Sequence, residues 1–131
     1  MSSILPNPVR LVQGRYQTLV FNFTDSEGAP IDISMWDFIC DFRYAIGDTD
    51  PVLSLDSRIS PPSIVKDGII VGQAYLVFAE NTLDPVVIPT TQNLDFPFCQ
   101  LVAELIYLED AVRKPGFMFR AHVYQATTRS A

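Results

Sequence analysis

Apolar and polar residues alternate most regularly between residues 36 and 43. The apolar set is Trp36, Phe38, Cys40 and Phe42, and the set between them is Asp37, Ile39, Asp41 and Arg43. Successive side chains of a β-strand point to opposite faces of its sheet. The alternation therefore predicts a strand with one buried face and one mostly solvated face. A helix would mix the two sets around its circumference.

Shorter extended patterns recur along the chain and are separated by turn-forming residues. Asp25, Gly28 and Pro30 mark one turn, since Asp bonds its own backbone, Gly accepts positive φ and Pro interrupts a strand. The last third reads as a long β-hairpin with its tip at residues 109–116. We expect strands at 16–23, 36–43, 52–55, 64–65, 69–78, 98–108 and 117–127. About seven strands without a helix predict an all-β fold, either a sandwich or a barrel.

Residues 1–13 read as an extended N-terminal arm in front of a single domain at residues 14–131. Pro6 and Pro8 exclude a helix in the arm. The arm either packs on its own domain or lies along a neighbouring protein, where it extends a sheet. Its candidate partner contacts are Leu5, Pro6, Val9 and Leu11.

The segment 81–97 is irregular and rich in proline, and it is apolar at Val86, Val87 and Ile88. Long irregular segments in compact domains are often functional. We favour a crossover between two sheets for this segment. The alternative is partner contact through Val86, Val87 and Ile88. A helical turn near Pro89 also fits the sequence.

The amino-acid composition argues against several classes of protein. The chain has 131 residues, of which 48% are hydrophobic and only 18% charged, with a net charge of -6. These values exclude intrinsic disorder and suggest that a partner covers some apolar surface. The basic residues are scattered, which argues against nucleic acid. No apolar run is long enough to span a membrane, and the N-terminus lacks a signal-peptide pattern.

The two cysteines, Cys40 and Cys99, invite comparison with the disulfide of antibody domains. Those domains place their core Trp after the first Cys, on the next strand, whereas Trp36 precedes Cys40 on the same strand. We therefore favour two buried free thiols over a disulfide.

Few residues of the sequence are candidates for a catalytic or metal-binding site. His122 is the only histidine, and no nucleophile motif surrounds it, so we read it as an exposed strand residue. Asp48 and Asp50 lack the glycine and terminal glutamate of a calcium loop and fit a solvated turn. We expect no catalytic, cofactor or metal site, and therefore no enzyme. A glycosidase-type pair of carboxylates stays open as an alternative, because such pairs are adjacent only in the folded structure.

Several motifs follow one another along the chain in an order that resembles a known protein family. An apolar strand after Gly14 leads to Asp25-x-x-Gly28-x-Pro30-Ile31-Asp32-Ile33 and then to the aromatic strand that ends at Arg43. Asp67-Gly68-Ile69-Ile70-Val71 and a closing Gly116-Phe-Met-Phe-Arg-Ala-His-Val follow. This order resembles the immunoglobulin-like domain at the N-terminus of phage baseplate upper proteins and related tail proteins. The resemblance implies an immunoglobulin-like antiparallel β-sandwich.

The resemblance also implies a function. We expect a structural component of a tailed-phage virion, assembled in the bacterial cytoplasm as a tail, baseplate or fibre-attachment module. Its partners would be other phage structural proteins, in a homo-oligomer or symmetric assembly. The alternatives are a capsid decoration or head–tail adaptor protein and a carbohydrate-binding module for host glycans. The last needs exposed aromatics, for which the candidates are Tyr16, Tyr44, Tyr75, Tyr107 and Tyr124. Their spacing with the phenylalanines predicts that most of them lie in the core.

Overall fold

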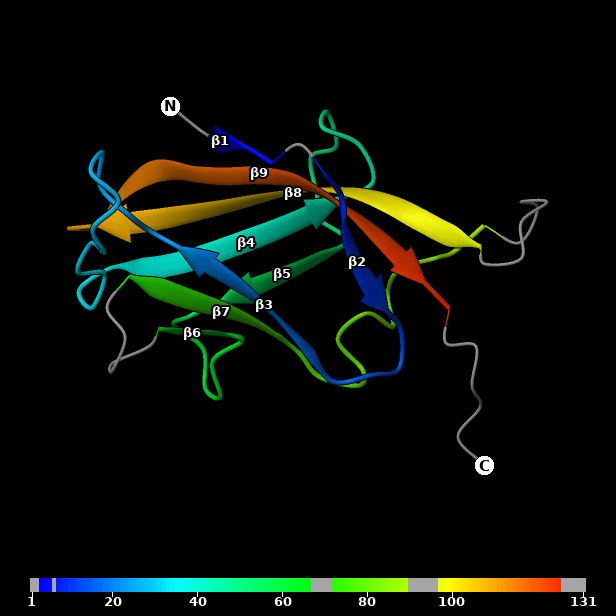
Figure 1. Cartoon of the computed structure of the whole chain (residues 1–131). Helices are drawn as coiled ribbons and strands as arrows, with labels where there is room; N and C mark the ends of the chain where they lie inside the picture. The colour runs from blue at the N-terminus through cyan, green and yellow to red at the C-terminus, as the bar shows by residue number, and fades with distance from the viewer. Residues whose placement is uncertain (1–2, 6, 67–71, 90–96, 126–131) are drawn as a thin grey trace.

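The computed structural model of the chain describes residues 3–5, 7–66, 72–89 and 97–125, and these residues contain strands and no helix. The strands are β1 (Ser3–Ile4), β2 (Val9–Val12), β3 (Gln17–Asn22), β4 (Asp37–Arg43), β5 (Leu53–Asp56), β6 (Ile64–Lys66), β7 (Gln73–Phe78), β8 (Phe98–Glu109) and β9 (Val112–Tyr124). Figure 1 shows two sheets facing each other. One has the order β1-β9-β8-β4-β5, with β2 also on β9, and the other has the order β3-β7-β6. The expected all-β sandwich is therefore confirmed.

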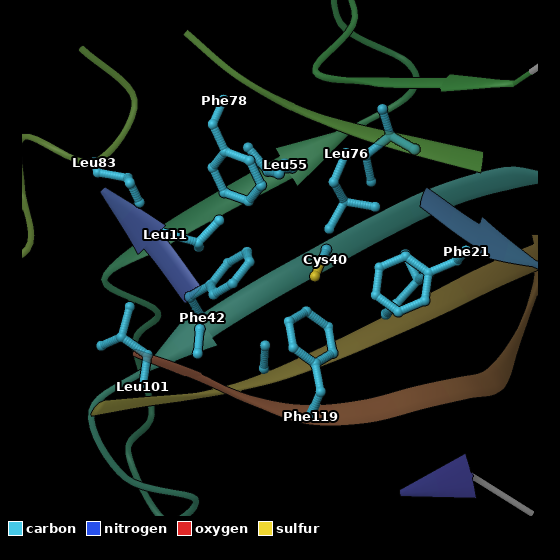
Figure 2. Packing of buried hydrophobic residues seen from close by; sticks show 14 of the residues in the cluster. Leu11, Phe21, Cys40, Phe42, Leu55, Leu76, Phe78, Leu83, Leu101 and Phe119 are labelled. Atoms are coloured by element: carbon cyan, nitrogen blue, oxygen red, sulfur yellow. The ribbon is translucent and has the colours of Figure 1, made fainter. Parts of the chain in front are cut away.

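The hydrophobic core lies between the two sheets (Figure 2). The alternation in β4 predicts its inner face correctly, because Phe38, Cys40 and Phe42 are each 0% exposed. From the opposite sheet Phe78 meets Phe42 edge-on, with ring centroids 5.9 Å apart. The outer face of β4 differs from the expectation at Ile39, which is buried as well.

The β8–β9 hairpin is longer than the sequence predicts. Its turn is only Asp110 and Ala111, with φ of 53° and 64°. Two consecutive residues with positive φ are typical of the tight turn that matches strand twist. The expected loop at 109–116 is therefore wrong, since residues 112–116 belong to β9. The pairing shifts register after Leu105, and Gly116 is the extra residue.

The N-terminal arm is part of the sandwich. Both β1 and β2 run parallel to β9, with Val9 opposite Ala121 and Val12 opposite Tyr124. The N–H of Leu5 donates to the carbonyl of Met118 at 2.9 Å. These two strands raise the strand number above the expected seven.

Residues 79–89 leave the three-stranded sheet and lead towards β8 in the six-stranded sheet, as expected of a crossover. Leu83, Val86 and Ile88 point into the core. The side-chain amide of Gln13 donates to the carbonyls of Leu83 and Val86, at 3.1 and 2.8 Å. This ties the crossover to the end of β2. The start of the expected strand at 69–78 and most of the expected helical turn near Pro89 lie outside the described residues.

Candidate functional site

The seven candidate contact residues are placed very differently. Leu11, Val86 and Ile88 are 0%, 3% and 7% exposed, so their side chains stabilise the chain's own core. They have almost no surface with which to contact a partner. Leu5 and Val9 are half-buried against the core, and Val87 is 70% exposed. Pro6 lies outside the described residues.

The histidine lies on the outer face of the six-stranded sheet. The His122 ring stacks on Phe98, with centroids 4.4 Å apart, and its Nε2 lies 3.0 Å from the side-chain oxygen of Gln100. Burial lowers the pKa of His122, and the nearby Arg120 and Arg10 lower it further. This favours the neutral ring. None of these neighbours is a hydroxyl or thiol nucleophile that the ring could activate.

Both cysteines are free and buried, as expected. Burial raises the pKa of Cys40 well above its usual value, and the carboxylates of Asp41 and Glu104 raise it further. Burial also raises the pKa of Cys99. Because the thiolate is the reactive form, both thiols are held in their unreactive state.

The described part of the chain holds no group of three or more His, Cys, Asp or Glu side chains arranged to bind a metal. Among the same residues, no helix has the length and hydropathy needed to cross a bilayer.

An apolar hollow with a volume of about 200 Å³ lies on the outer face of the six-stranded sheet. We call it the outer groove. It is lined by Leu5, Ile46, Val102, Ala103, Met118, Phe119 and Arg120. A smaller hollow of about 70 Å³ shares Ile46, Val102 and Met118 with it.

Strand register places the apolar residues of the outer groove. Val102 on β8 and Met118 on β9 alternate with the buried Ala103 and Phe119, so they point away from the core. The hydrogen bond from Leu5 to Met118 brings the arm to one side. The β4–β5 loop brings Ile46, which is 75% exposed.

Asp48 holds the turn that carries Ile46. Its carboxylate accepts the N–H of Ala45 at 3.0 Å, and its own N–H donates to the carbonyl of Ala45 at 3.1 Å. The Nε of Arg43 donates to the Asp48 carbonyl at 3.1 Å. The acidic stretch thus forms a turn, as expected for Asp48, and it fixes the position of Ile46 beside the sheet.

Charges flank the outer groove on the β4 side. Asp41 lies opposite Glu104 in register, and like charges in that position repel. Asp41 is balanced by Arg43, whose Nη2 lies 3.5 Å from its carboxylate, and it accepts the hydroxyl of Ser54 at 2.6 Å. The groove thus pairs an apolar floor with a polar rim, the usual composition of a protein-binding surface.

Two loops lie together next to this region. The hydroxyl of Tyr44 accepts the N–H of Val87 at 3.0 Å, which joins the β4–β5 loop to the crossover. Tyr44 is 44% exposed, so Tyr44, Ile46 and Val87 add apolar surface. Of the other tyrosines, only Tyr16 is exposed, while Tyr75, Tyr107 and Tyr124 are half-buried.

Sequence reasoning missed the principal residues of the outer groove, Ile46, Val102 and Met118. One weak signal was present, because the outward-facing set of β8 includes the apolar Val102 and Ile106 beside the polar Gln100 and Glu104. Apolar side chains on an outward sheet face are candidates for cover by a partner.

No protein-family model matches the chain, and no curated protein is significantly similar to it.

Proposed function

We propose that this chain is a structural component of a tailed-phage virion that docks other virion proteins through the outer groove. Docking through the outer groove is supported by the apolar hollow between Leu5, Ile46, Val102 and Met118. Its volume is below the roughly 300–1,000 Å³ of ordinary small-molecule pockets. It fits one or two apolar side chains of a protein partner.

We also propose that the sandwich is immunoglobulin-like. In the variable-type domain, strands G, F, C and C′ lie in one sheet, and B, E and D lie in the other. The order β9-β8-β4-β5 corresponds to the first set and β3-β7-β6 to the second. Trp36 then precedes the C strand and stacks on Tyr107, with ring centroids 4.1 Å apart. This agrees with the family resemblance on which the virion assignment rests.

The turn chemistry behind that resemblance is consistent with the geometry. The Asp25 carboxylate accepts the N–H groups of Glu27 and Ala29, at 2.9 and 3.0 Å, and Gly28 has a φ of 85°.

A charge in the outer groove tests the proposed function. We expect Val102→Glu in the phage genome that encodes the chain to lower the titre of infectious particles at least tenfold, because burying an unpaired carboxylate at a docked interface is costly. Purified particles should also contain less of the chain, as measured by quantitative mass spectrometry.

Val65→Glu is the matched control, because Val65 is an exposed strand valine of the other sheet. It should leave both the titre and the chain's content unchanged. Circular dichroism of both purified variants checks that they fold. An unchanged titre for folded Val102→Glu contradicts docking through the groove, and absence of the wild-type chain from particles contradicts the virion assignment.

A further inference from the structure

The strands of the described residues leave four sheet edges, and three of them are protected. β5 has four residues and follows Pro51, and β6 has three residues, follows Pro61 and Pro62, and ends at Lys66. The arm covers β9 with two short strands and carries Pro8 between them. Short strands, prolines and charges are the devices that prevent sheets from pairing edge to edge.

The fourth edge, β3, has none of these devices. It is six residues long, contains no proline and no charge, and pairs only with β7 in the described part of the chain. The uncharged run continues on both sides, from Tyr16 to Thr24. The arm, which could have covered β3, lies on β9 instead.

The direction of the free backbone groups follows from the β3–β7 ladder. The N–H of Phe23 donates to the carbonyl of Gly72 at 2.6 Å, so Phe23 bonds towards β7. Bonding alternates along a strand, so Phe21 and Leu19 also bond towards β7. The N–H and C=O groups of Thr18, Val20 and Asn22 therefore point away from the sheet, and within the described residues no backbone partner meets them.

Charge complementarity indicates which partner fits this edge. The uncharged run is bounded by Arg15 at one end and Asp25 at the other, both exposed. Two antiparallel copies of β3 centred on Val20 place Val20 opposite Val20 and Thr18 opposite Asn22, and they bring Arg15 of one copy and Asp25 of the other to the same end of the pair. In this register every outward-pointing backbone group of one copy meets an outward-pointing group of the other. Each end of the pair therefore carries an arginine and an aspartate of opposite charge.

We propose that the chain forms a symmetric dimer in which β3 pairs antiparallel with β3 of a second copy, centred on Val20. The two three-stranded sheets then form one continuous sheet, and the interface is self-complementary, as two-fold symmetry requires. This proposal is independent of the virion assignment. A dimer without any virion role, or a virion role without this dimer, remains a distinguishable result.

The first test is the oligomeric state of the purified chain. Sedimentation equilibrium at about 1–100 μM should give a dimer, since this range covers specific but moderate affinities. Val20→Lys, which places two lysines opposite each other, should be monomeric over that range.

Val65→Lys is the matched control for that substitution. Val20 and Val65 both pair with Tyr75, from opposite sides, so they lie in one row of one sheet face and are 46% and 40% exposed. Val65→Lys should remain a dimer. A monomeric wild type, or a Val20→Lys dimer as tight as that of Val65→Lys, overturns the proposal.

The second test fixes the register. In a hydrogen-bonded antiparallel pair the Cα atoms are about 5.5 Å apart, a spacing that a disulfide spans. Val20→Cys should give a covalent dimer on mild oxidation, whereas Thr18→Cys alone should not, because its partner is Asn22. Thr18→Cys mixed with Asn22→Cys should crosslink. Crosslinking of Thr18→Cys with itself at the rate of Val20→Cys contradicts the register.

The end charges give a third readout. Asp25→Asn keeps the side-chain oxygen that accepts the turn's N–H groups and removes only the charge. It should weaken the dimer by about a few-fold and reduce the salt dependence of dissociation, as expected for an exposed ion pair. A dimer whose affinity and salt dependence are unchanged in Asp25→Asn contradicts the pairing of Arg15 with Asp25.

Discussion

At the scale of single residues, the β8–β9 hairpin has no room for a Cβ atom at Gly116. A Cβ added at Gly116 would overlap the carbonyl oxygen of Leu105 across the bulge. Because that oxygen belongs to the backbone of a central strand, it cannot move without disturbing β8. Gly116 is therefore required for packing at this position.

We expect Gly116→Ala to lower the free energy of unfolding by about 1–3 kcal/mol, the usual cost of overpacking. Urea unfolding followed by the fluorescence of Trp36 measures the change. Gly47→Ala is the control, since nothing lies within 4 Å of an added Cβ there. Equal stability of the two variants would contradict the steric argument.

His122 makes stability depend on pH near neutrality. Its pKa is lowered in the folded protein by burial and by Arg120 and Arg10, so the unfolded chain takes up the proton first. The free energy of unfolding should therefore fall as the pH drops below about 6.5 towards the folded pKa of His122. Asp56, whose pKa is lowered by Arg58, loses its stabilising contribution only at more acidic pH.

His122→Gln should remove the pH dependence between pH 7.5 and the range where carboxylates titrate. Unfolding curves of both proteins at matched pH values test this, with wild type and variant compared at pH 8 as the reference. An equally steep dependence in the variant would assign the effect to another group.

At the scale of elements, the N-terminal arm contributes to the stability of the domain. Leu11 on β2 is 0% exposed and packs with the core cluster, and β2 is held to β9 over its whole length. The arm thus contributes to the folding of the domain, whether or not it also contacts a partner.

We expect Leu11→Ala to destabilise the protein by about 2–5 kcal/mol, as removal of a buried leucine side chain generally does. Val87→Ala, at a site 70% exposed, should change stability by less than about 0.5 kcal/mol. Thermal unfolding of both variants measures the difference. A Leu11→Ala variant as stable as wild type would show that β2 is dispensable.

The sequence predicts local elements better than their pairing. The alternation in β4 identifies its inner face because each inner residue is apolar, and the turn at Asp25 carries its own chemistry. The turn at Asp110 and Ala111 lacks a glycine, so the charged residues around it read as a loop. The pairing of β2 with β9 joins the two ends of the chain, and no local pattern encodes it.

Local sequence predicts the candidate site even less well than the strand pairing, because the residues of the site are far apart in the chain. Leu5, Ile46, Val102 and Met118 come from the arm, a loop and two different strands, and strand pairing together with the turn at Asp48 brings them together. Val86 and Ile88 illustrate the converse case. Their apolar character suggests a contact surface in sequence, and the crossover turns them into the core instead.

At the scale of the whole molecule, the chain presents two different surfaces on its two sheets. The outer groove lies on the six-stranded sheet, and the edge of β3 that no described strand covers belongs to the three-stranded sheet. A module that pairs with its own copy through one sheet and docks a different protein through the other suits a symmetric assembly. The low fraction of charged residues, 18%, agrees with two covered surfaces.

The most direct test of the proposed function is a cryo-electron microscopy reconstruction of the particles produced by the genome that encodes this chain. The proposal predicts density for the β-sandwich at symmetry-related positions, with the outer groove occupied by apolar side chains of a neighbouring structural protein. Particles whose complete density contains no copy of the chain, or a copy whose outer groove faces solvent, would contradict it.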